Sequence, residues 1–229
     1  MLPKRWQACL KGLEAQTLIV WFALASALWL FFILGAETGE GDTGAFDRQL
    51  ITLLRTSGGN GREPIGPAWF NDAMRDVTAL GGFTFLTLMT IVVVLALFFH
   101  RKRREATILI TTAISAQTSI EVMKFLYDRP RPTLLTPQIH AFTKSFPSGH
   151  TTESTAIFLT VATVIASLEA KDNTKILAYV VATLVIFAIG FSRVYLGMHW
   201  PTDVLGGWVL GTAWALAAWT ALRKKPASP

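Results

Sequence analysis

The chain has a single cysteine and few charges, and both shortages exclude whole classes of protein. With Cys9 as the one cysteine among 229 residues, neither an internal disulfide framework nor a cysteine-cluster metal site is possible. Charged residues make up only 16% of the sequence, against 52% hydrophobic residues. This balance excludes intrinsic disorder, a coiled coil and a collagen-like fibre. The length favours one domain over residues 1–229.

The net charge of +6, from 21 Lys and Arg against 15 Asp and Glu, has two interpretations. In a soluble protein such an excess indicates nucleic-acid binding. In a chain this hydrophobic it indicates cationic flanks of membrane helices and an anionic substrate. The basic run at residues 100–104 fits a helix flank that meets anionic lipid. We therefore expect a lipid bilayer as a partner and no nucleic acid.

Six hydrophobic segments approach the roughly 20 residues that cross the hydrocarbon core of a bilayer. They are Thr17–Ala36, Leu80–Phe99, Ala106–Met123, Thr151–Leu168, Ile176–Phe191 and Val204–Leu222. The first segment is longer than the roughly 7–15 apolar residues of a secretory signal, so we expect a retained helix. The predicted fold class is all-α, a polytopic membrane protein built as a bundle of six transmembrane helices.

The segment between the first two spans has its own helical pattern. Residues 46–55 and 67–79 place apolar side chains at helical spacing, with charges on the opposite side. We expect two short interfacial or external helices there. Trp69 and Phe70 suit a helix at the membrane interface, although packing over the bundle is the simpler role.

The basic residues predict the orientation. Because short cytoplasmic segments carry an excess of Lys and Arg, the side that holds most of them is expected to face the cytoplasm. Twelve of the 21 fall on one side of this topology: Lys4, Arg5, Lys11, Arg101–Arg104, Lys171, Lys175 and Arg223–Lys225. Both termini are therefore expected in the cytoplasm, and the loops after the first, third and fifth spans outside.

Three groups of polar residues fall at the external ends of the spans, at 124–132, 147–150 and 192–203. They include Lys124, Arg131 and Arg193, three cations that would repel one another unless they bind a multiply charged anion. The planar fork of Arg matches two phosphate oxygens, and Lys adds a point charge. These cations predict a phosphate pocket. Nearby, Arg129 and Lys144 are expected to be solvated surface charges.

Two further groups supply reactive atoms. Ser148 and Gly149 precede a predicted helix, so their backbone N–H groups and the Ser148 hydroxyl can point at the same anion. His199 and Asp203 are four residues apart, and on a helix the carboxylate would hold one ring nitrogen and leave the other basic. His150 is then free to donate a proton. Taken alone, the His199–Asp203 pair also fits two metal ligands or a capping contact.

Together these residues resemble the signature motifs of a known family. Lys124-x6-Arg131-Pro132, Pro147–His150 and Ser192-Arg193-x5-His199-x3-Asp203 are similar to the three motifs of the type 2 phosphatidic acid phosphatase superfamily, without a departure at the specified positions. The motifs cover residues 124–203. The six-helix layout resembles the integral-membrane lipid phosphatase branch, which includes bacterial phosphatidylglycerophosphate and undecaprenyl pyrophosphate phosphatases.

The resemblance implies a role for each motif residue. His199 would be the nucleophile that forms a phosphohistidine, Asp203 its orienting partner, and His150 the acid that protonates the leaving oxygen. The phosphate cradle would consist of Lys124, Arg131, Ser148, Gly149 and Arg193. The resemblance further implies a metal-independent lipid phosphatase without a cofactor, located in a bacterial inner membrane with its active site on the external side.

Other functions share these motifs. A phosphotransferase would pass the phosphoryl group from the same phosphohistidine to a lipid acceptor instead of water. A haloperoxidase uses a similar pocket for vanadate, but a small membrane bundle is an improbable host. A non-enzymatic lipid-phosphate transporter or binding protein would not require the complete set of two histidines and an aspartate. We therefore expect a phosphatase that acts on a membrane lipid phosphate or pyrophosphate.

Overall fold

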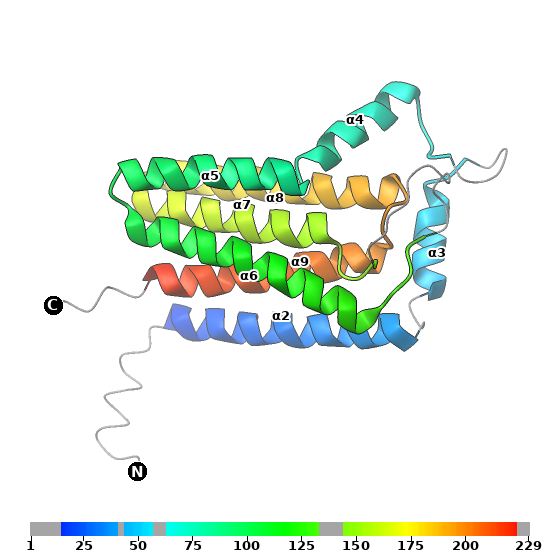
Figure 1. Ribbon diagram of the computed structural model, residues 1–229, viewed down its shortest axis with the longest axis horizontal. Helices are drawn as coiled ribbons and strands as arrows, with labels where there is room; N and C mark the ends of the chain where they lie inside the picture. Colours follow the sequence, from blue (N-terminus) through cyan, green and yellow to red (C-terminus); the bar gives the residue numbers. More distant parts are fainter. Residues whose placement is uncertain (1–14, 41–43, 57–62, 133–143, 224–229) are drawn as a thin grey trace, which may run out of the picture.

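The computed structural model describes residues 15–40, 44–56, 63–132 and 144–223 (Figure 1). Those ranges form eight α-helices and no β-sheet: α2 (Ala15–Glu40), α3 (Gly44–Leu53), α4 (Ala68–Ala79), α5 (Phe83–Phe99), α6 (Arg103–Tyr127), α7 (Gly149–Leu168), α8 (Asp172–Tyr195) and α9 (Pro201–Arg223). The predicted all-α class is confirmed. The basic residues at positions 4, 5, 11, 224 and 225 lie outside the described residues.

Five helices are long and apolar enough to cross a membrane, namely α2, α6, α7, α8 and α9. The sixth candidate is the pair α4 and α5, which is bent by 48°. Large apolar side chains such as Phe22, Phe99 and Phe125 are exposed on the outside of the bundle. Exposed apolar side chains on helices of this length fit a lipid environment. The protein is a multi-pass membrane protein.

The helices extend beyond the hydrophobic segments at the end of the bundle where α3 lies. α6 ends at Tyr127 and not at the predicted Met123, and α8 ends at Tyr195 and not at Phe191. α7 begins at Gly149 and not at the predicted Thr151, and α9 begins at Pro201 and not at Val204. Hydropathy falls at the first polar side chain, whereas helical backbone bonds continue wherever such side chains find partners. Lys124, Arg193 and Asp203 therefore lie on helices.

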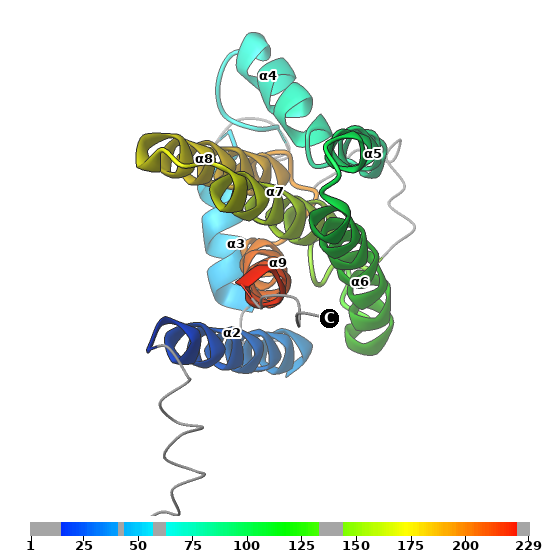
Figure 2. The same ribbon diagram turned by 90° about the vertical axis from the view of Figure 1, so that its left-hand side faces the viewer.

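The core of the bundle is formed by α7, which packs against α6, α8 and α9, while α2 packs against α9 from the outside (Figure 2). Glycines of α9 face hydroxyl side chains of α7. A Cβ on Gly207 would lie 2.9 Å from the Thr151 Cβ, and one on Gly211 would lie 2.5 Å from the Thr152 carbonyl oxygen. Small residues at such contacts let membrane helices approach closely.

Both short helices expected between the first two spans are confirmed at the α3 end. α3 lies across the end of the bundle and α4 projects from it (Figure 1). Just after α3, the buried Arg55 donates to the Tyr195 carbonyl at 2.7 Å. Phe70 packs edge-on against Tyr195, with 5.1 Å between ring centroids, whereas Trp69 is exposed. The start of α2 and the end of α9 lie at the opposite end of the bundle (Figure 1).

The α7–α9 contact predicts that Gly211→Ala destabilises the protein. The added methyl group meets a backbone carbonyl that cannot move independently of α7, and overpacking of this kind costs about 1–3 kcal/mol. Gly44→Ala is the matched control, because its methyl group meets only the flexible Arg48 side chain. Thermal melts of the variants purified in detergent measure the difference. Equal melting temperatures for Gly211→Ala and Gly44→Ala would contradict the close contact.

Candidate active site

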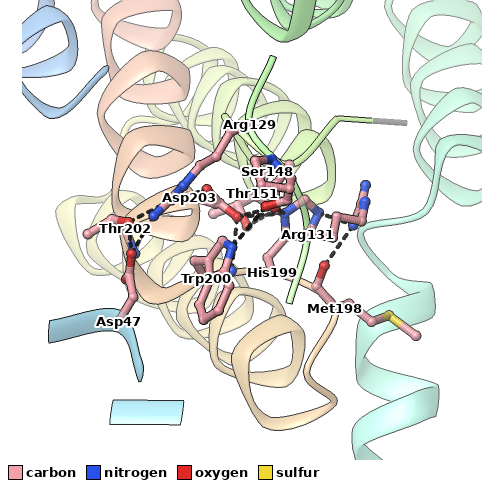
Figure 3. A network of polar contacts seen from close by, with 12 residues as sticks. Asp47, Arg129, Arg131, Ser148, Thr151, Met198, His199, Trp200, Thr202 and Asp203 are labelled. Atoms are coloured by element: carbon pink, nitrogen blue, oxygen red, sulfur yellow. Dashed lines mark hydrogen bonds and ion pairs between the residues drawn. The ribbon is translucent and has the colours of Figure 1, made fainter. Parts of the chain in front are cut away.

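The three polar groups of the sequence meet at the α3 end of the bundle (Figure 3). They come from the end of α6 and the segment after it, from the start of α7, and from the end of α8 through the first turn of α9. The Ser148 N–H donates to the Asp203 carbonyl at 3.0 Å. Arg131 donates to the Met198 carbonyl at 2.7 Å. These bonds join all three groups into one site.

His199 lies in the loop between α8 and α9 rather than on a helix. The loop is tight because Gly197, with a φ of 73°, ends α8 in the left-handed conformation that helix ends favour. The His199 N–H then donates to the Arg193 carbonyl at 3.3 Å. The ring still reaches its expected partner, since Nδ1 lies 3.2 Å from Oδ2 of Asp203.

The hydrogen bonds to the His199 ring define its tautomer. Nη1 of Arg131 lies 2.9 Å from Nε2 of His199. Because a guanidinium has only donors, Nε2 must be the acceptor, and the ring proton is on Nδ1. Nδ1–H then donates to Asp203. The ring nitrogen that carries a lone pair therefore faces the cationic side of the site.

The surroundings of His199 also keep its ring neutral. The ring is 1% exposed. Burial, followed by the positive charges of Arg193 and Arg131, lowers the pKa of His199 from 6.5 to about 3, against the opposing effect of the hydrogen bond to Asp203. Burial lowers the pKa of Arg131 as well, and the charge of Asp203 opposes that shift. At neutral pH, Nε2 is therefore available as a base or a nucleophile.

The Asp203 carboxylate is fully buried and accepts hydrogen bonds on both oxygens. Oδ1 accepts from Arg129 at 2.5 Å. Oδ2 accepts from the Trp200 N–H at 2.9 Å, from the Ser145 hydroxyl and from His199. Trp200 precedes the first residue of α9 and Asp203 is the third, so their bond is half of a capping box. The helix start itself therefore fixes the carboxylate that orients His199.

The three predicted cations approach a common space beside His199. Nη1 of the buried Arg193 donates to the Thr78 hydroxyl of α4 at 3.0 Å. Its Nε is buried without a hydrogen-bond partner among the described residues. Nζ of Lys124 would lie 3.7 Å from a Cβ built on Gly149. Buried N–H groups are costly when unpaired, and the oxygens of a bound phosphate would satisfy the Arg193 Nε–H.

The N-terminus of α7 fits the phosphate prediction only in part. Ser148 was expected to offer both its N–H and its hydroxyl, but its N–H is occupied by the Asp203 carbonyl. The Ser148 oxygen accepts from Thr151 at 2.9 Å, which leaves the Ser148 hydroxyl proton available. The N–H groups of Gly149 and His150 fall in the first turn, where a helix has no acceptor of its own. An anion there would bind these two groups instead.

His150 lies on the first turn of α7, beside the bend between α4 and α5. A Cβ built on Gly82 would lie 3.8 Å from its Nε2. The site residues close enough to interact with it electrostatically are Arg193, His199, Arg131 and Lys124. All eight predicted site residues are therefore brought together. Within the described ranges, no group of three or more His, Cys, Asp or Glu side chains could hold a metal ion.

The prediction for Arg129 is wrong, whereas Lys144 is exposed and pairs with Asp128 as a surface charge should. Arg129 is 8% exposed, because its guanidinium is neutralised by two buried carboxylates, Asp203 and Asp47. Spacing alone did not separate the two basic residues. The one available signal was Asp47, which lies in the amphipathic segment 46–55. A carboxylate next to a membrane needs a partner, and Arg129 could have been that partner.

An imidazole lone pair that faces several cations suits phosphoryl transfer, and the fold places this chemistry in a membrane. The class is therefore a membrane-embedded phosphoryl-transfer enzyme. Residues 105–227 match the PAP2 superfamily, and the chain belongs to that superfamily. The resemblance predicted from the three motifs is confirmed, and the protein is a phosphatase of the PAP2 type.

Individual relatives agree with this assignment. Phosphatidylglycerophosphatase B of Bacillus subtilis is 32% identical over 144 residues, which are 62% of this chain and 70% of that protein. The undecaprenyl-diphosphatase of Sulfolobus acidocaldarius is 34% identical over 128 residues, 53% of this chain and 57% of that protein. The crystal structure of a transmembrane PAP2-type phosphatidylglycerolphosphate phosphatase from Bacillus subtilis has a TM-score of 0.75 at 27% identity, covering 86% of this chain and 94% of that one.

Proposed function

We propose that the protein hydrolyses a phosphomonoester or pyrophosphate on a membrane lipid, such as undecaprenyl pyrophosphate, phosphatidylglycerophosphate or phosphatidic acid. The observation that carries the proposal is the accepting Nε2 of the buried, neutral His199, which faces Arg131. The names of the relatives support a lipid as the substrate.

In the first step, Nε2 of His199 attacks the phosphorus atom. An N–P bond forms while the P–O bond to the lipid breaks, and His150 gives a proton to the leaving oxygen. The imidazole of the resulting phosphohistidine carries a positive charge. Asp203 stabilises that charge through the bond to Nδ1–H, as the carboxylate of a base–orienter pair does.

The cations of the site would hold the phosphoryl group during both steps. Without an anion, Arg131 donates to Nε2 of His199. When the phosphate binds, the same N–H has to move to a phosphate oxygen, which frees the lone pair for attack. Lys124 and Arg193 add charge at the other oxygens, where negative charge develops in the transition state.

In the second step, water releases the phosphate. His150, now neutral, takes a proton from a water molecule, and the water oxygen attacks the phosphorus atom. The N–P bond breaks, its electron pair returns to Nε2, and inorganic phosphate leaves. His199 and His150 are then back in their starting protonation states.

A cavity beside the site supports a lipid substrate. It has a volume of about 460 Å³ and lies between α5, α6 and α7. Glu153, one turn after His150, lines it together with apolar side chains that include Ile91, Leu95, Ile114 and Ile157. An apolar cavity within membrane helices suits a hydrocarbon chain. A soluble phosphate ester without a hydrocarbon chain would gain no binding free energy from such a surface.

We propose further that the site faces the outside of a bacterial cytoplasmic membrane, with both termini in the cytoplasm. The basic run Arg101–Arg104 covers the turn after α5 and the start of α6, at the end of the bundle opposite to α3 (Figure 1). The start of α2 and the end of α9 lie at that same end. The excess of Lys and Arg in short cytoplasmic segments supports this orientation.

Phosphate release by the purified protein tests the reaction. We expect release from at least one of undecaprenyl pyrophosphate, phosphatidylglycerophosphate and phosphatidic acid, without any acceptor alcohol. Activity should survive excess EDTA, and vanadate should block it, because vanadate adopts a five-coordinate geometry with His199 at one apex. Restoration by Mg²⁺ or Zn²⁺ after EDTA would contradict the metal-independent mechanism. Turnover only with an acceptor would identify a phosphotransferase, and binding without turnover a transporter.

Thiol labelling in intact cells tests the orientation. In a background that lacks Cys9, Lys144→Cys should react with a membrane-impermeant reagent, because Lys144 is exposed at the α3 end. Lys171→Cys, between α7 and α8 at the opposite end, is the matched control and should react only after the cells are opened. The reverse pattern would contradict an external site.

A further inference from the structure

Asp47 is a buried carboxylate outside the three motifs. It lies in the first turn of α3 and is fully buried. Oδ1 accepts the Thr202 N–H at 3.0 Å, and Oδ2 accepts the Thr202 hydroxyl at 2.7 Å. Thr202 immediately precedes Asp203. α3 therefore binds α9 directly beside the carboxylate that holds His199 (Figure 3).

Arg129 connects Asp47 to Asp203. Nη2 of Arg129 lies 2.5 Å from Asp47, and Nη1 lies 2.5 Å from Asp203. Nη1 also donates to the Thr202 hydroxyl at 2.8 Å, and the guanidinium lies 5.8 Å from the centre of the Trp200 ring. One guanidinium is thus shared between two carboxylates, in an orientation fixed by several contacts (Figure 3).

We propose that Asp47 is a positioning residue that acts on the His199–Asp203 pair through Arg129. This inference rests on the proposed function, in which Asp203 stabilises the imidazolium of His199. With Asp47 present, the charge of Arg129 is divided between two carboxylates, and Asp203 retains negative potential toward His199. Without the charge of Asp47, Arg129 pairs with Asp203 alone, pulls it away from the ring and weakens its effect on the phosphohistidine.

Two cations of the phosphate pocket are held by partners other than Asp47. Arg131 is held by the Met198 carbonyl and Arg193 by the Thr78 hydroxyl, neither of which contacts Asp47 among the hydrogen bonds of the described residues. Loss of the Asp47 charge should therefore affect the chemical step rather than phosphate binding. A purely structural role, by contrast, would lower the amount of folded enzyme and leave the kcat of the folded fraction unchanged.

The test is Asp47→Asn in the full-length protein. Asparagine keeps the shape and can still accept the Thr202 N–H, but it carries no charge. We expect kcat to fall about 10- to 100-fold, by analogy with the loss of activity when the hydrogen-bond partner of a metal-binding side chain is removed. KM and the inhibition constant of inorganic phosphate should stay unchanged. Asp72→Asn is the matched control, because Asp72 is exposed on α4, and it should have wild-type kcat.

A double-mutant cycle shows whether Asp47 acts through Asp203. If it does, Asp47→Asn combined with Asp203→Asn should have the same kcat as Asp203→Asn alone, because the second change removes the group that the first one acts on. Arg129→Lys breaks the bridge from the other side, since a lysine cannot hold two carboxylates in one plane. It should show the same loss of kcat and the same non-additivity.

Several results would overturn the inference. They are wild-type kcat in Asp47→Asn, a loss that multiplies with that of Asp203→Asn, or a loss that disappears once activity is normalised to folded protein by thermal melting. If Asp47→Asn cannot be purified in folded form, the kcat of Arg129→Lys is the test. A wild-type kcat in that variant overturns the inference. Failure of the proposed function is distinguishable, because the wild-type protein itself would then release no phosphate.

Discussion

A carboxylate can be buried at the end of a membrane helix only if donors meet its oxygens, because an unpaired buried charge is far too costly. The α3 end of this bundle supplies donors to Asp203 from three segments: Arg129 after α6, Ser145 before α7, and His199 and Trp200 in the loop before α9. Segments distant in the sequence are brought together around this one group. The position and tautomer of His199 follow from it.

The close packing of α7 against α9 also positions residues at the α3 end of the bundle. The Ser148 N–H, at the start of α7, binds the Asp203 carbonyl, so the two helix starts are held at a fixed distance. Glycines at 207 and 211 allow the helices to come that near. The first turn of α7 is thereby held next to the start of α9. The packing of α7 against α9 within the membrane thus sets the positions of the site residues at the ends of these helices.

Much of this could be predicted from the sequence, because hydropathy locates spans and short spacings locate motifs. Six spans, two short helices and a shared end for the three motifs follow from those patterns. Helix ends could not all be predicted, since a polar residue such as Lys124 continues a helix only when the site gives it partners. Arg129 and Asp47 were missed because they are 82 residues apart, and their pairing depends on how α3 crosses the bundle.

The central claim is that His199 carries the phosphoryl group while His150 moves the proton. Quench-flow with radiolabelled p-nitrophenyl phosphate measures this directly, because its leaving group needs little protonation. The account predicts an acid-labile phosphoenzyme in the wild-type protein and in His150→Ala, and none in His199→Ala. A phosphoenzyme that persists in His199→Ala and is absent from His150→Ala would contradict the account and reverse the two roles.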